Sequence, residues 1–185
     1  MLKARLVAAL LAVALAATSS VNTGPALAAS AADINRDANA VMAQLYANKP
    51  EAKKLASQAK AILIFPSIYK AGFMFGAQYG EGVLRRGNKS VGYYNTLAAS
   101  YGWQAGAQAF GYALFFMNDS ALSYLNKSEG FEVGLGPSIV VLDEGMGKSM
   151  TSSTVTQDIY ALIFDQKGLM AGAGIQGSKI SKIDK

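Results

Sequence analysis

The sequence of 185 residues contains no histidine and no cysteine. Without histidine, the chain cannot form a Ser-His-Asp or Cys-His nucleophile system. Without either residue, it cannot hold zinc through imidazole or thiolate ligands. The lack of cysteine also excludes a disulfide framework and a cysteine for lipid attachment, so the fold must be stabilised by burial alone. These absences remove most hydrolytic mechanisms and favour a protein that binds over one that catalyses.

The stretches that resemble enzyme motifs are incomplete. The stretch "EGMGKS", from Glu144 to Ser149, resembles the end of a phosphate-binding loop, but Leu142 stands where that pattern requires glycine. The S-x-x-K pattern of serine acyl-enzymes occurs at Ser57–Lys60 and Ser67–Lys70, in both cases without an S-D-N or K-T-G element. We therefore expect no enzymatic activity, no metal site and no cofactor.

The N-terminus has the pattern of a secretory signal peptide. Lys3 and Arg5 form a short basic region, the apolar "LVAALLAVALAA" follows, and Ala26 and Ala28 provide a small-x-small cleavage site. The apolar run is shorter than the ~20 residues that a spanning helix needs. We expect cleavage after Ala28, residues 29–185 as a single exported domain, and a periplasmic location at a membrane surface. Removing Lys3 and Arg5 lowers the formal net charge from +5 to +3, a mild basic bias that permits attraction to anionic lipid.

The pattern of residues 30–61 predicts two helices. A capping-box-like start at Ser30 precedes apolar residues that recur on one face. Pro50 suits the first turn of the second helix. A basic stripe runs beside the alanine-rich apolar face of that helix, which predicts either solvated lysines on a helix docked against the core or a secondary contact with a membrane surface. The stripe consists of Lys49, Lys53 and Lys60.

From Ile62 onward the pattern predicts strands. The stretch "KAGFMFGAQYGEGVLRRGNK", residues 70–89, alternates bulky residues with glycines, so one face of the strand is nearly bare. Such alternation predicts a strand that curves tightly or is closely crossed by another backbone. Residues 90–117 contain no charged residue. Their recurring glycines and polar residues disfavour a transmembrane helix and predict two curved strands joined near the middle.

The remaining elements complete an α+β chain, helical over residues 30–61 and mainly β over 62–185. A short helix is expected near residues 119–127, followed by further strands up to residue 183. We expect the N-terminal helices to pack on a curved antiparallel sheet, or on a small β-barrel or sandwich, with glycine-rich strands.

Several glycine-aromatic motifs occur in the order and spacing of the SYLF domain family. They are "IFPSIYKAGFMFGAQYGEGVL", "YNTLAASYGWQAGAQ", "FFMND", "GPSIVV" and "QKGLMAGAGIQGSKI", between about Ala52 and Ile183. The chain therefore resembles this family, and its signal-peptide pattern resembles the exported bacterial branch. The resemblance implies a lipid-binding module. Eukaryotic members bind phosphoinositides and some act on actin at membranes, but an exported protein would not meet actin in its own cell, so we expect no actin partner.

The chain departs from the family pattern in three places. It has "KSVGYYNTL" where many members have a Trp-Ser-x-Pro element, and Ala109–Gly111 where many have an acidic residue. It has "LDEGMGKS" where eukaryotic members often have a basic glycine-rich turn. These departures argue against an actin role. Phosphoinositide selectivity is not expected either, because phosphoinositides are not typical of bacterial envelopes. The expected ligand class is therefore anionic phospholipid, or more generally an anionic membrane surface.

Basic residues flank the glycine-aromatic stretch and form the predicted lipid-binding site. Arginine can donate two hydrogen bonds at once to a head-group phosphate, and lysine adds a point charge. Three or four such cations, each contributing ~1 kcal/mol at an anionic surface, would give reversible binding without insertion. The same residues are also typical of an ordinary solvated hairpin turn. The predicted site consists of Lys70, Arg85, Arg86 and Lys89.

Two other functions stay open. In one, the protein is a structural or assembly factor of the envelope that binds a protein partner, and its binding would survive high salt. In the other, the uncharged alternating strands belong to a barrel embedded in an outer membrane, which solubility without detergent would exclude. We expect no nucleic-acid partner.

Overall fold

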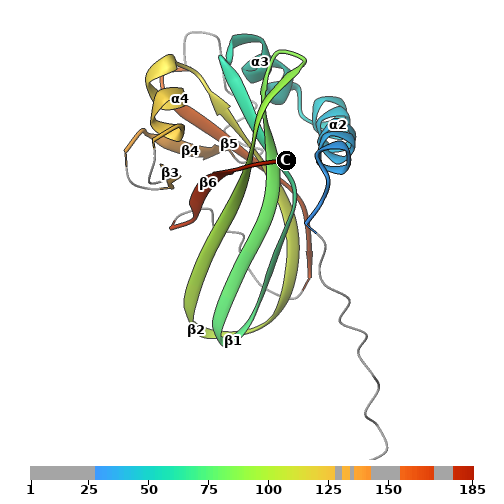
Figure 1. Ribbon diagram of the computed structural model, residues 1–185, viewed down its shortest axis with the longest axis vertical. Helices are drawn as coiled ribbons and strands as arrows, with labels where there is room; N and C mark the ends of the chain where they lie inside the picture. The colour runs from blue at the N-terminus through green and yellow to red at the C-terminus, as the bar shows by residue number, and fades with distance from the viewer. Residues whose placement is uncertain (1–27, 128–130, 134–135, 143–154, 169–176) are drawn as a thin grey trace, which may run out of the picture.

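The structure, a computed structural model, describes residues 28–127, 131–133, 136–142, 155–168 and 177–185. Most of the predicted signal peptide, 1–27, and the predicted turn at 144–149 lie outside the described residues. Helices lie on and beside a strongly curled sheet of six strands within the described part of the chain (Figure 1). The predicted α+β class is confirmed.

Three helices lie within the described residues, and each begins where the sequence favours a helix start. The Ser30 hydroxyl accepts a hydrogen bond from the Asp33 amide at 3.1 Å, and Asn118 accepts one from the Ala121 amide at 2.8 Å. Pro50 is the first residue of the second helix. None of these helices is both long and apolar enough to cross a membrane. The helices are α2 (Ala31–Asn48), α3 (Pro50–Gln58) and α4 (Asp119–Leu125).

The sheet is built on one long antiparallel hairpin. β1 (Ala61–Arg86) pairs with β2 (Lys89–Phe116) along almost its whole length. β2 is one continuous strand where the sequence predicts two. β1 also runs through Pro66, although proline has no N–H to donate to the ladder. A register shift between Phe65 and Ile68 accommodates this proline, because a bulge needs no ladder hydrogen bond from its nitrogen.

The other strands lie along the second edge of β2. β6 (Lys179–Ile183) pairs with its first part and β5 (Ile159–Gly168) with its last part, both antiparallel. β3 (Phe131–Glu132) pairs antiparallel with β6, whereas β4 (Ile139–Leu142) pairs in parallel with β5. The sheet is therefore mixed rather than antiparallel throughout, because β4 and β5 pair in parallel at this edge. The chain between β4 and β5 is long enough for the crossover that parallel pairing requires.

The β1–β2 hairpin bends back on itself near residues 72–76 (Figure 1). Beyond the bend, the second half of β1 lies against its first half. A Cβ atom at Gly80 would lie 2.6 Å from Cγ1 of Ile68, and one at Gly82 would lie 2.7 Å from the Phe65 ring. Only glycine permits such an approach. This confirms the prediction that a backbone crosses the bare glycine face, and the crossing segment is the first half of the same strand.

Two apolar layers lie on opposite faces of the curled sheet. Leu63 and Phe65 point into the curl, where α4 and Phe131 also pack. Ile64 points the other way, into a layer shared with α2 and α3. Inside the curl, the buried Tyr112 hydroxyl donates a hydrogen bond to the buried Thr96 at 3.0 Å. Burial raises the pKa of Tyr112, so this hydroxyl stays protonated and able to donate.

Candidate functional site

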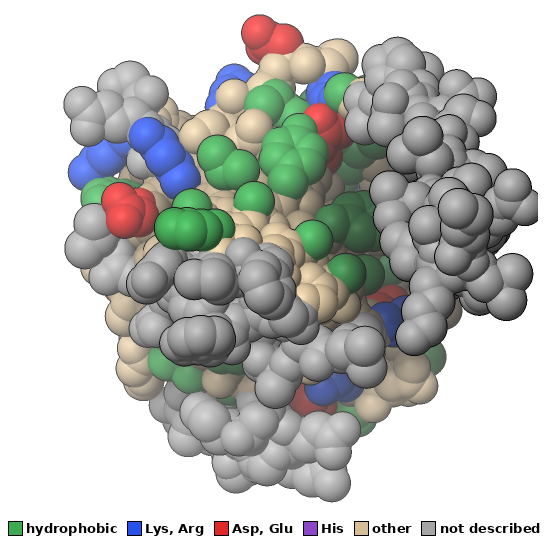
Figure 2. Space-filling model, turned by 90° about the horizontal axis from the view of Figure 1, so that it is seen from below, with side chains coloured by type: hydrophobic (Ala, Val, Ile, Leu, Met, Phe, Trp, Pro, Cys, Tyr) green, Lys and Arg blue, Asp and Glu red, His purple; other side chains and the backbone are tan. Residues whose placement is uncertain are grey.

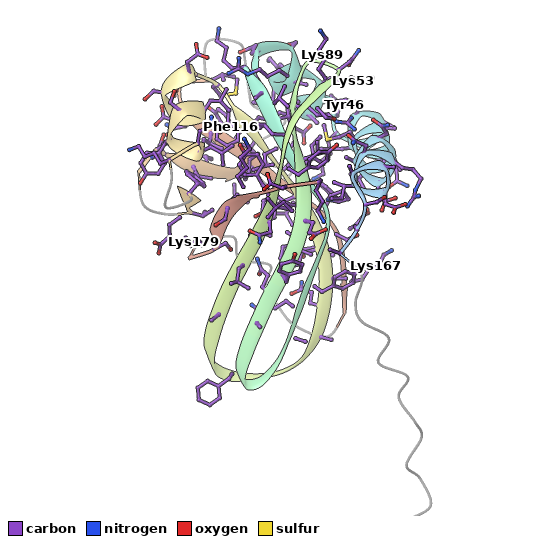
Figure 3. The ribbon with its side chains drawn as sticks, in the orientation of Figure 1. Tyr46, Lys53, Lys89, Phe116, Lys167 and Lys179 are labelled. Atoms are coloured by element: carbon purple, nitrogen blue, oxygen red, sulfur yellow. The ribbon has the colours of Figure 1, made fainter. Side chains whose placement is uncertain are left out.

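The turn of the hairpin presents two cations to solvent. Arg86 and Lys89 are exposed and stand opposite each other in the last rung of the β1–β2 ladder, on either side of the turn. Gly87 in the turn has φ +57°, a conformation that glycine adopts without strain. Lys89 projects at the end of the molecule where α3 also lies (Figure 3). Two of the four predicted site residues therefore share one exposed end.

Arg85 has a structural role that the sequence does not predict. Its guanidinium donates to the side-chain oxygen of Asn39 at 2.6 Å and to the Asn35 carbonyl at 3.1 Å. Ser90 donates to the side-chain oxygen of Asn35 at 2.6 Å, so the hairpin is tied to α2 from both strands. Burial raises the pKa of Tyr46 in α2, and the positive charge of Arg85 partly offsets this rise. Arg85 thus directs its charge and its hydrogen bonds toward α2.

Lys70 lies apart from the turn residues. It pairs with Gln108 close to the bend and is partly buried. The two halves of β1 run in opposite directions, and Gly80 lies against Ile68. Measured along the folded strand, Lys70 is therefore about eight residues from Arg86, which is roughly 25 Å at 3.3 Å per residue. The structure therefore does not bring the four predicted residues into one cluster.

Two lysines of the predicted basic stripe join the turn instead. Lys53 is exposed on α3, and Lys60 is exposed between α3 and β1. The start of β1 lies at the same end as Arg86, because Gly82 lies against Ile64. Lys49, the third residue of the stripe, is partly buried where α2 meets α3. We call the four exposed cations the basic end: Lys53, Lys60, Arg86 and Lys89.

The cations of the basic end form no ion pair with any acidic side chain in the described part of the chain. Ion pairs in the described part of the chain join Arg36 to Asp33 and Asp37, and Lys185 to Glu81. None of them involves a residue of the basic end. Such a group of cations attracts phosphate through charge and, at Arg86, through paired hydrogen bonds.

The bent end of the hairpin has the opposite chemistry. Residues 71–80 of β1 and residues 96–107 of β2, which pair with them around the bend, contain no charged residue. Tyr69 is 66% exposed, Phe75 70% and Leu97 54%. Seen from this end, hydrophobic side chains gather near the centre of the described surface, and charged ones lie mostly toward its margins (Figure 2). We call this region the uncharged end.

Two clefts lie beside α2, and neither is lined mainly by cations. The larger, of about 520 Å³, lies between the start of α2 and β1, with Tyr69 and Tyr79 on its wall beside the acidic Asp37 and Glu81. The smaller, of about 300 Å³, includes Lys49 but also Asp165 of β5. Within the described residues, no group of three or more His, Cys, Asp or Glu side chains is arranged to hold a metal ion.

Comparison with known proteins adds one match. Residues 97–185 match the model of the Ysc84 family, described as a Las17-binding protein actin regulator. The matched part begins within β2 and includes α4 and strands β3 to β6. It contains the motifs from "LAASYGWQAGAQ" onward and excludes the glycine-aromatic half of β1. No curated protein matches the chain.

Proposed function

Because the chain belongs to the SYLF domain family, we propose that it is an exported, non-catalytic protein of the cell envelope that binds anionic phospholipid head groups through its basic end. One observation carries the proposal. Four exposed cations share this end, and none forms an ion pair with the described acidic side chains. At ~1 kcal/mol for each cation near an anionic surface, the four would supply about 4 kcal/mol, enough for reversible binding.

The proposal replaces two of the four residues in the predicted site. Arg85 is excluded from it, since its hydrogen bonds go to Asn35 and Asn39. Lys70 is excluded because it lies near the bend. Lys53 and Lys60 take their place beside Arg86 and Lys89. The resulting surface combines an arginine for paired hydrogen bonds with three lysines for long-range attraction.

Co-sedimentation with vesicles tests this function. The full chain is expressed with its leader, and the exported protein is mixed with neutral or anionic vesicles. We expect binding to the anionic vesicles alone, weakening as salt rises. The triple variant Lys53→Gln, Arg86→Gln, Lys89→Gln is expected to bind about 100-fold more weakly.

A matched triple variant removes the same charge elsewhere. Lys70→Gln, Lys167→Gln and Lys179→Gln alter cations that lie toward the uncharged end; Figure 3 shows the last two. This control is expected to keep most of the affinity. Equal loss in both variants would show that net charge alone acts, and unchanged binding in the first would refute the basic end as the site.

The exposed apolar side chains favour a second function. Tyr69, Phe75 and Leu97 are large apolar side chains that are exposed to solvent, and exposed apolar side chains are typical of contacts between proteins. In that function the protein would be a structural or assembly factor of the envelope. A pull-down from envelope extracts would recover a specific partner whose binding persists at high salt. The partner would be lost in Leu97→Ser and kept in Lys89→Gln.

The family description also names actin regulation. We do not assign that role to this chain. The signal-peptide pattern predicts export, and an exported protein does not meet the actin of its own cell.

A further inference from the structure

Residues from the two ends of the described chain meet at one carboxylate, that of Glu81. The backbone nitrogen of Ala29 donates to its Oε2 at 3.1 Å. The Lys185 ammonium lies 2.9 Å from the same oxygen and donates to the Ala29 carbonyl at 2.8 Å. The Tyr79 hydroxyl donates to Oε1 at 2.8 Å. Both oxygens of Glu81 are therefore held by donors.

The Glu81 carboxylate is charged although it is nearly shielded from water. Its side chain is 9% exposed and that of Lys185 is 10% exposed. Burial raises the pKa of Glu81, but the hydrogen bonds from Lys185 and Tyr79 outweigh this effect and hold the pKa below its usual value. A shielded charge needs opposite charge and hydrogen bonds around it. The surroundings of Glu81 are therefore suited to receive a cation.

Ala29 is the residue that the predicted cleavage would make the N-terminus. Ala26 and Ala28 form the small-x-small pattern, and Ala28 and Ala29 are both exposed. We propose that Glu81 is the binding site for the α-ammonium group that removal of the signal peptide creates at Ala29. This inference rests on the export that the proposed function includes. It does not depend on lipid binding, because no residue that contacts Glu81 belongs to the basic end.

The chemistry of cleavage places the new charge at the carboxylate. A signal peptidase adds one water across the bond between Ala28 and Ala29. Ala28 keeps the oxygen and leaves as a carboxylate, and the Ala29 nitrogen takes both protons and becomes an ammonium group. That nitrogen already lies 3.1 Å from Glu81, so no rearrangement is needed.

The new charge faces a mixed set of groups. Besides Glu81, the cleft beside Ala29 is lined by Asp37, which is itself paired with Arg36. Lys185 is the cation that faces Glu81 before cleavage. Cleavage therefore converts a neutral amide donor into a second cation on Glu81, and charge-assisted hydrogen bonds are stronger than neutral ones. Processing thus stabilises the folded chain.

The N-terminal residue and the pKa of its amine test the proposal directly. The full chain is expressed with its leader, and mass spectrometry of the exported protein is expected to find Ala29 as the first residue. The reactivity of the α-amine toward an acylating reagent is then measured against pH. We expect a pKa above the usual ~7.7–8.0 in the parent and a return to that range in Glu81→Gln. A different first residue, or an ordinary pKa in the parent, would refute the proposal.

A double-mutant cycle separates the ammonium from the Lys185 contact. Inserting Gly-Ser between Ala28 and Ala29 moves the new ammonium about 7 Å along the chain and leaves Lys185 in place. We expect Glu81→Gln to lower Tm by several degrees in the parent and by clearly less in the insertion variant. Glu132→Gln, which alters an exposed side chain, serves as the control and is expected to leave Tm unchanged in both the parent and the insertion variant. An equal effect of Glu81→Gln in both backgrounds would assign Glu81 to Lys185 alone.

Discussion

The two ends of the β1–β2 hairpin are made from the same two strands but differ in what covers them. Val83 and Tyr79 lie on the same face of β1, four residues apart. Val83 is fully buried beneath α2 and α3, whereas Tyr79 is 45% exposed beyond them. The pattern of a strand alone therefore does not decide which part of its face becomes core. The reach of the covering helices decides it.

The same two ends also differ in their charged residues. Arg85 ties the covered end to α2, and the cations of the basic end lie around it. Toward the bend, both strands lose all charged residues and are folded face to face. A long uncharged stretch, which can suggest a membrane helix, is here explained by strands that bury one face against their own other half. The following variants test how far the two ends are independent.

The largest effect is expected at the glycine face that lets the hairpin fold over. Gly82→Val places a branched side chain against the Ile64 carbonyl and the Phe65 ring. We expect the free energy of unfolding to fall by about 3 kcal/mol or more. Ala77→Val, on the exposed outer face of the same strand, is expected to change it by less than about 0.5 kcal/mol. Urea unfolding followed by circular dichroism measures both values, and similar values would contradict the packing of the two halves.

A second, smaller effect separates the two neighbouring arginines. Arg85→Gln removes charged hydrogen bonds to α2 and is expected to cost about 2 kcal/mol of stability. Arg86→Gln is expected to leave stability within about 0.5 kcal/mol but to weaken binding to anionic vesicles. Thermal unfolding and co-sedimentation of the two variants check this division. Destabilisation by Arg86→Gln alone would reverse the two roles.

Part of this division could be predicted from sequence, and part depends on distant partners. The periodicity of residues 70–82 is a local pattern, and it correctly predicts a bare face crossed by a backbone. The role of Arg85 depends on Asn35 and Asn39, which lie about fifty residues earlier in the chain. A basic turn offers no signal for such docking. The asparagines Asn35 and Asn39 on the polar side of the predicted helix are only a weak indication that another segment docks there.

The same reason explains the errors in strand pairing. The parallel pairing of β4 with β5 joins strands that are separated in the sequence, and no local pattern specifies such pairing. A proline usually interrupts the hydrogen-bond ladder of a strand, because it has no N–H to donate. Pro66 lies in a bulge, where no ladder hydrogen bond is needed from its nitrogen. The distance between Lys70 and Arg86 depends on where β1 bends, because the two residues are 16 positions apart and lie on different halves of the folded strand. Sequence periodicity therefore predicts faces better than it predicts distances.

The free energy of unfolding is expected to depend on pH through Glu81, which lies at the boundary between the two ends. Glu81 lies between the buried Val83 and the exposed Tyr79, and its pKa is lower in the fold than the ordinary value of 4.5. Its contribution to stability is therefore complete above the unfolded pKa and is lost as pH falls through the folded pKa. We expect the difference in unfolding free energy between the parent and Glu81→Gln to shrink as pH is lowered from 7 to below 4.5. A difference that stays constant with pH would show that the charge of Glu81 contributes nothing.

The smallest effect is expected at the uncharged end when vesicles bind. Trp103, the one tryptophan in the sequence, lies in β2 between Tyr101 and Ala105, opposite the bend of β1. If the basic end holds the membrane, this part of β2 does not contact the bilayer, and the emission maximum of Trp103 does not shift when anionic vesicles are added. Leu97→Ser, which makes the exposed face of the same strand less apolar, should leave vesicle binding unchanged, whereas Lys89→Gln should weaken it. A blue shift of Trp103 emission, together with weaker binding by Leu97→Ser, would show that the uncharged end enters the bilayer and would exchange the roles of the two ends.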